Sequence, residues 1–124
     1  MSIADELAEI PLVDQHCHAV VLDPLDRRQF ELLLTEARDP SPAGTSALDS
    51  QVGLAVRRWC APVLGLDKHA DPDAYLARRV ELGPRETARM LLQACGSSDL
   101  LVDTGLAWPG LCDLVELGDL AAVR

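Results

Sequence analysis

The stretch PLVDQHCH, residues 11 to 18, carries two of the three histidines of the chain, spaced one residue apart. A proline is tolerated at the start of a strand but not inside a central one, so the apolar run predicts a strand over residues 12 to 18. Side chains alternate between the two faces of a strand, so His16 and His18 point the same way, about 7 Å apart. Two imidazoles so placed can bind one divalent metal ion. The sequence therefore predicts a metal site at His16 and His18.

The sequence also indicates whether Asp14, Cys17 and His69 take part in this metal site. Asp14 lies two residues before His16 on the same face of the strand, and its carboxylate is expected to orient a histidine ligand without binding the metal itself. Cys17 points to the opposite face, which argues against a role as ligand. His69 stands in a polar loop and is expected to be a solvated residue. The other cysteines are scattered with no C-x-x-C pair, so we expect reduced thiols that fill space in the core.

The elements that position these residues are mostly helices. Two of the predicted helices begin with an aspartate at the N-cap followed by a proline, at Asp23–Pro24 and at Asp71–Pro72. Pro62 is expected to kink or end its helix, and the helix over residues 84–95 is expected to bury the stripe Ala88, Leu91, Leu92 and Cys95. The predicted helices cover residues 2–9, 24–38, 46–62, 72–82 and 84–95, and a further helix begins in the tail, residues 108–124.

A second strand is predicted over residues 99 to 104, apolar along its length as parallel strands buried on both faces tend to be. Strands joined through helices indicate a parallel βαβ unit with a right-handed crossover. Functional groups gather at the carboxyl ends of parallel strands, which is where the histidine pair stands. Two strands alone make a poor sheet, so the chain resembles the beginning of a larger fold.

PLVDQHCH resembles the first strand of the amidohydrolase superfamily, whose members are metal-dependent (β/α)₈ barrels. Three further segments, at residues 30–37, 46–66 and 100–106, resemble the amidohydrolase-related (amidohydrolase 2) branch. The resemblance covers nearly the whole chain. It implies an α/β fold, the N-terminal part of a (β/α)₈ TIM barrel, mainly helical with two parallel strands. Residues 1–124 would then be an incomplete barrel domain with a helical insertion at about 24–96.

The resemblance also implies a function. In the family, the histidines matching His16 and His18 bind the catalytic metal, usually zinc, so the expected cofactor is a divalent metal ion. The further histidines and the aspartate that the family supplies from later strands are absent. The chain would be the N-terminal portion of a metal-dependent amidohydrolase that hydrolyses amide-like C–N bonds of a small-molecule substrate, inactive alone, and its own enzyme status stays open. Alternatives are a decarboxylase of the same superfamily and a non-catalytic helical binding or interaction domain.

LLVDTG, residues 100 to 105, also matches the Asp-Thr-Gly signature of aspartic proteases. Those enzymes are all-β, whereas the residues before Asp103 have helical periodicity, so this motif is not favoured. Two interpretations of Asp103 remain. It is either a strand-end carboxylate that accepts loop N–H bonds or a polar group near the metal.

Composition limits the partners. The 124 residues are 48% hydrophobic, and 20 acidic residues against 11 basic give a net charge of −9. Such a surface repels phosphate groups, so we expect neither nucleic acid nor a membrane as partner. The arginine pairs are expected on solvated helix faces. With no leader or spanning segment, a cytoplasmic bacterial protein is expected, and a homo-oligomer is left open.

Overall fold

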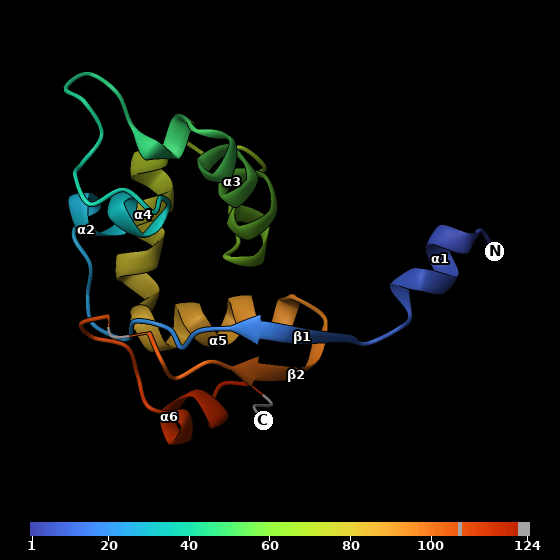
Figure 1. Cartoon of the computed structure of the whole chain (residues 1–124). Helices are drawn as coiled ribbons and strands as arrows, with labels where there is room; N and C mark the ends of the chain where they lie inside the picture. The colour runs from blue at the N-terminus through green and yellow to red at the C-terminus, as the bar shows by residue number, and fades with distance from the viewer. Residues whose placement is uncertain (107, 122–124) are drawn as a thin grey trace. The chain divides into compact units, whose positions relative to one another are not determined.

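The computed structural model describes residues 1–106 and 108–121 (Figure 1). The chain divides into two compact units. The first combines Met1–Leu22 with the chain from Ala88 onward, and the second is Asp23–Thr87. No helix among the described residues is long and apolar enough to cross a membrane.

The first unit contains a two-stranded parallel sheet of β1 (Leu12–Cys17) and β2 (Ser97–Val102). The strands pair from Leu12↔Ser97 to Cys17↔Val102, with irregular register between Asp14 and Cys17. The predicted pair of parallel strands, and with it the α/β class, is confirmed. The second strand begins two residues earlier than predicted and ends before Asp103.

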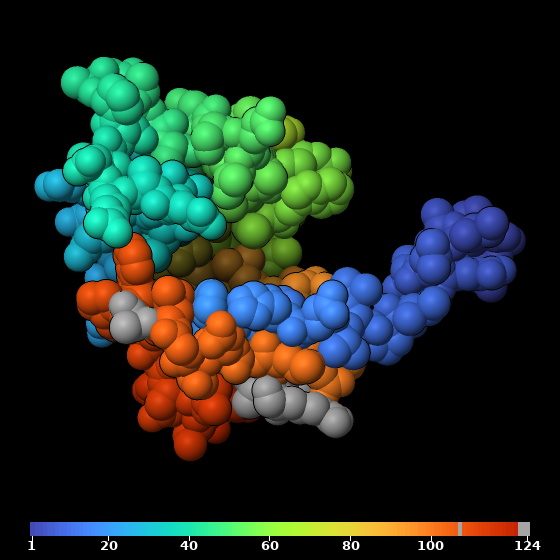
Figure 2. Space-filling model, viewed as in Figure 1, coloured from blue at the N-terminus to red at the C-terminus, as the bar shows by residue number. Residues whose placement is uncertain are grey.

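The strands are more exposed than their apolar sequence predicts. Leu12 and Val13 of β1 are 57% and 56% exposed, and within β2 only Leu100 is buried. Atoms of both strands are visible at the surface in the space-filling view (Figure 2). The expectation of burial on both faces is therefore wrong, because successive residues of β1, whose side chains alternate between the faces, are both exposed among the described residues.

Two short helices of the first unit begin with capping boxes, in which the cap side chain and the third helical residue bond each other's main chain. In α1 (Ile3–Ala8) these residues are Ser2 and Asp5, and no residue of the helix is buried. In α6 (Leu114–Gly118) they are Asp113 and Glu116. Leu117 and Leu120 are buried there and supply core.

α5 (Pro84–Ala94) begins directly after Gly83, as predicted. Its predicted buried stripe is wrong. Thr87 is the buried residue of α5, Ala88 and Leu91 are half-buried, and Cys95, the residue after the helix, is exposed. Leu92 is also half-buried, so the predicted stripe is partly covered rather than buried.

The second unit consists of α2 (Arg27–Leu33), a 3₁₀ turn η1 (Ala47–Asp49), α3 (Gln51–Val63) and α4 (Pro72–Leu82). Asp71 caps α4 as predicted, by accepting a hydrogen bond from the Asp73 N–H. The predicted start of α2 at Asp23–Pro24 is wrong. Asp26 caps that helix instead, because it forms a reciprocal capping box with Gln29.

The predicted helix from Ser46 is also interrupted. Ser46 caps only η1, and Ser50 then caps α3 by accepting from the Gly53 N–H. Pro62 stands in the last turn of α3, which ends at Val63. Gly53 is buried where η1 meets α3. A Cβ at this position would lie 2.3 Å from the Ala47 carbonyl oxygen, so the close approach requires glycine.

The core of the second unit is built around two aromatic rings. The rings of Phe30 and Tyr75 lie 6.1 Å apart, and both side chains are buried. The Arg79 guanidinium lies 4.6 Å from the Phe30 ring centre and donates a hydrogen bond of 3.4 Å to the Tyr75 hydroxyl. Leu48, Ala61 and Leu64 of the same unit are also fully buried.

Candidate metal centre

The carboxyl ends of the two strands bring three metal-binding residue types together. His16 is the penultimate residue of β1, His18 follows that strand, and Asp103 follows β2. The Asp103 N–H donates to the Cys17 carbonyl oxygen at 2.8 Å. This main-chain bond fixes the two strand ends side by side, so the positions of all three side chains follow from the parallel pairing.

One donor atom from each of His16, His18 and Asp103 lies within 4.8 Å of the other two. The two imidazole rings are 5.2 Å apart and nearly perpendicular, at 84°. Nε2 of His16 lies 3.9 Å from Oδ2 of Asp103. The prediction that the two histidines share one side of the strand agrees with this geometry.

The main chain of Asp103 orients the ring of His18. Its carbonyl oxygen lies 3.0 Å from Nδ1 of His18. A carbonyl oxygen can only accept, so this nitrogen carries the proton and the lone pair is left on Nε2. Histidines that bind metals are commonly oriented in this way by a carbonyl or carboxylate on the other ring nitrogen. His18 is therefore held in a tautomer that can ligate through Nε2.

The carboxylate of Asp103 is held by one of its two oxygens. Oδ1 accepts a hydrogen bond of 2.7 Å from the Gly105 N–H, while Oδ2 faces His16. The side chains of His16 and Asp103 are 65% and 46% exposed, so an ion can reach them from solvent. One carboxylate thus combines a bond to the loop N–H with a place beside the two histidines, which the sequence left as alternatives.

Asp14 and Cys17 have other roles at the site. Asp14 Oδ1 accepts from the main-chain N–H of His16 at 3.2 Å, so it orients the backbone of His16 rather than its ring. The Cys17 thiol lies 3.7 Å from the Leu101 carbonyl oxygen. Burial, followed by the negative charge of Asp14, raises the pKa of Cys17. A protonated thiol is a poor ligand, consistent with the expectation that Cys17 does not bind the metal.

The donor set fits a divalent transition metal. Imidazole nitrogen and carboxylate oxygen bind zinc at about 2.0–2.2 Å, so donors of a tetrahedral site lie about 3.4 Å apart. Donor atoms that lie up to 4.8 Å apart must approach one another by up to about 1.4 Å, which the exposed side chains of His16 and Asp103 can do by rotation. Three protein ligands also leave a coordination position open to water or another ligand.

The sequence predicted that His16 and His18 lie together, and it left the role of Asp103 undecided. The signal for Asp103 was its place directly after the second apolar run, because the ends of parallel strands meet at one edge. His69 lies in the other unit, exposed, in the loop between α3 and α4. The protease-like Asp-Thr-Gly triplet stands in a chain of mainly helical elements, unlike the all-β proteases.

One known protein is similar to this chain over most of its length. It is the DNA mismatch repair protein MutS of Parasynechococcus marenigrum (strain WH8102), with 32% identity over 120 residues. The match covers 90% of this chain but only 13% of MutS, so the chain spans a small part of the relative it matches. No family model matches the chain, and no solved structure matches it.

This similarity overturns several predictions. The resemblance to the amidohydrolase superfamily is wrong, because the protein that the chain resembles across its length is a DNA mismatch repair protein. The functions attached to the resemblance, amide hydrolysis and the decarboxylase alternative, are wrong for the same reason. The prediction that nucleic acid is not a partner is also contradicted, since the similar protein is named as a DNA mismatch repair protein.

Proposed function

We propose that the chain binds one divalent transition-metal ion through His16, His18 and Asp103. The observation that carries this proposal is the convergence of three donor atoms within 4.8 Å at the ends of two hydrogen-bonded strands. The hydrogen bond at Nδ1 of His18 supports it, because the lone pair on Nε2 is then available without a change of tautomer. Two nitrogen donors and one oxygen donor suit Zn²⁺, the ion expected from the sequence, and neighbouring transition metals better than Ca²⁺ or Mg²⁺.

The test uses the three histidines as separate reporters. The full chain, freed of metal with a chelator, is titrated with Zn²⁺ while the ring ¹H–¹³C signals of the histidines are followed by NMR. We expect the signals of His16 and His18 to change together and saturate at one equivalent, while that of His69 stays in place. Equal changes at all three rings, or none, would contradict the proposal; the four free cysteines are alkylated beforehand, so that they hold no zinc in this titration.

A second candidate function is binding of DNA, and the similarity to MutS is the observation in its favour. The net charge of −9 opposes it, because a phosphate backbone is attracted by basic surfaces. Several arginines are already used within the second unit: Arg27 pairs with Glu31 and Asp73, and Arg57 pairs with Asp49. DNA binding by this chain would therefore rely on few phosphate contacts and depend weakly on salt.

Fluorescence anisotropy of a labelled duplex tests this second candidate. A duplex with one mismatched base pair and its fully paired counterpart are titrated with the chain at low ionic strength, with and without Zn²⁺. Saturable binding that favours the mismatched duplex supports a repair-related role. Unchanged anisotropy of both duplexes at the highest protein concentration would remove DNA binding and leave the metal proposal intact.

A further inference from the structure

The side chains of β1 and β2 contribute little to the pairing of the two strands. No residue of β1 is buried, and Leu12 and Val13 are each more than half exposed. Leu100 is the one buried residue of β2. Because the strands bury little apolar surface, their pairing gains little from the hydrophobic effect. Two strands without such burial are only marginally stable in water.

The pairing is also interrupted at the end of the sheet where the metal donors lie. Asp14 pairs with Leu100 and Cys17 pairs with Val102, so residues 15 and 16 of β1 stand opposite residue 101 alone. A bulge of this kind leaves one residue unpaired and disrupts the hydrogen bonds of the ladder locally. His16 lies inside the bulge. The strand ends are therefore least well held where the three donors converge.

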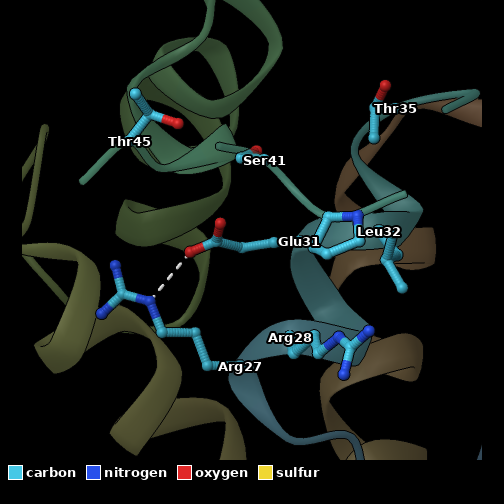
Figure 3. A pocket seen from close by; sticks show the side chains of 8 residues that line it. Arg27, Arg28, Glu31, Leu32, Thr35, Ser41 and Thr45 are labelled. Atoms are coloured by element: carbon cyan, nitrogen blue, oxygen red, sulfur yellow. Dashed lines mark hydrogen bonds and ion pairs between the residues drawn. The ribbon is translucent and has the colours of Figure 1, made fainter. Parts of the chain in front are cut away.

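The second unit shows how segments can be joined directly. Oε1 of Glu31 accepts a hydrogen bond of 2.8 Å from Arg27 Nε (Figure 3), and its Oε2 accepts one of 3.0 Å from the Ala47 N–H, so the carboxylate links α2 to η1. Between β1 and β2, Nε2 of His16 and Oδ2 of Asp103 lie 3.9 Å apart, which is too far for a hydrogen bond. An ion that both atoms ligate would supply the missing link.

We propose that the metal ion holds β1 and β2 together, so that metal binding and strand pairing stabilise each other. The inference rests on the metal site proposed above. His16 and His18 come from the first strand and its end, whereas Asp103 follows the second strand, 85 residues after His18. Separated strands would offer the ion only the two histidines. The factor by which pairing raises metal affinity is therefore also the factor by which the metal favours pairing.

Amide hydrogen exchange of the full chain with alkylated cysteines, without and with saturating Zn²⁺, tests this coupling. Two main-chain bonds report the pairing: Leu12 N–H to the Gly96 carbonyl oxygen, at 3.1 Å, and Asp103 N–H to that of Cys17, at 2.8 Å. Leu12 begins β1, at the end away from the donors, so its exchange reports pairing rather than contact with the ion. We expect Zn²⁺ to slow both amides by about tenfold or more, and the Ala47 N–H of the second unit by less than about twofold.

The ring signals of His16 and His18 in the same samples separate two kinds of failure. If these signals do not respond to Zn²⁺, the metal site is wrong and this inference fails with it. If they saturate while the Leu12 and Asp103 amides exchange as before, the ion binds without holding the strands together. Equal slowing at Ala47 would mean that the ion stabilises the whole chain rather than the strand pair. Either of these last two results overturns the proposal and leaves the metal site in place.

A pair of neighbouring substitutions in β2 tests the reverse direction of the coupling. Leu100→Ala removes the buried side chain of the strand and leaves all three donors in place, so weaker pairing should lower Zn²⁺ affinity by about fivefold or more. Leu101→Ala, at a position that is 40% exposed, is the control and should change the affinity by less than about twofold. Equal affinities would overturn the proposal. The exchange measurement needs no variant, so it decides the matter if Leu100→Ala does not fold.

Discussion

The main-chain carbonyl oxygen of Asp103 lies 3.0 Å from Nδ1 of His18, while the carboxylate of the same aspartate faces His16 at 3.9 Å. One residue thus contacts both histidines, through the backbone in one case and the side chain in the other. The first contact depends on the strand pairing and survives substitution of the Asp103 side chain. The second depends on the carboxylate, so the two contributions can be separated by mutation.

His16→Ala and His18→Ala should each reduce zinc affinity below detection, because either change leaves two of the three donors. His69→Ala should bind like the unmodified chain, since that residue lies in the other unit. Isothermal titration calorimetry on chains with alkylated cysteines measures the difference. Equal affinities in all three variants would remove the metal site.

Asp103→Asn should keep the fold and lose most of the metal affinity. The amide oxygen can still accept from the Gly105 N–H, and the main-chain bond to His18 is unchanged. A neutral amide is a much weaker ligand than a carboxylate for a transition metal. Zinc titration and thermal unfolding of the same sample separate the two effects. Full metal affinity in this variant would show that Asp103 is not a ligand.

Glu31→Gln should destabilise the chain by about 1–3 kcal/mol at neutral pH, because it weakens charge-assisted bonds to Arg27, Ser46 and the Ala47 N–H. Urea unfolding measures the loss. Glu36→Gln, on an exposed residue just beyond α2, is the control and should unfold like the unmodified chain.

The same variant has a defined pH dependence. Partial burial raises the pKa of Glu31, but hydrogen bonds from Arg27, Ala47 and Ser46 outweigh it and hold the pKa below its usual range. A lowered folded-state pKa contributes stability above the usual carboxyl value of about 4.3 that is lost as pH falls through the folded value. The gap between Glu31→Gln and the unmodified chain should therefore shrink in acid. A gap that is constant with pH would contradict this assignment.

Tyr75 should ionise at higher pH than an exposed tyrosine. Burial raises the pKa of its hydroxyl, and the nearby charge of Arg79 offsets only part of that effect. Tyr75 is the single tyrosine of the chain, so phenolate absorbance at alkaline pH reports this group alone. In concentrated urea the transition should return to about 10. Identical transitions in the folded and unfolded chain would show that the ring is not buried.

Gly53→Ala should destabilise the second unit by about 1–3 kcal/mol or more, because the added methyl group meets backbone atoms that cannot rotate away. The helix propensity of alanine opposes this loss by about 1 kcal/mol. Gln51→Ala, on an exposed residue of the same helix, is the control. Thermal unfolding compares the two. A Gly53→Ala chain as stable as the control would mean that η1 does not pack closely on α3.

The sequence by itself determined features that depend on local chemistry. The Asp71–Pro72 start of α4, the Gly83–Pro84 junction and the two parallel strands all follow from backbone constraints and apolar runs that act over a few residues. The shared side of His16 and His18 follows from strand alternation. The start of α2 was missed because two aspartates compete as caps, and the reciprocal bond between Asp26 and Gln29 decided between them.

Only the tertiary structure decided that Asp103 lies beside the two histidines, and which residues of α5 and β1 are buried. Asp103 lies 85 residues after His18, and only strand pairing brings it to the site. Burial of Thr87 rather than the apolar stripe of α5, and the exposure of β1, depend on which surfaces other elements cover. An apolar run determines that a segment can be buried, but the neighbours that cover it are set by contacts distant in sequence, which no local pattern encodes.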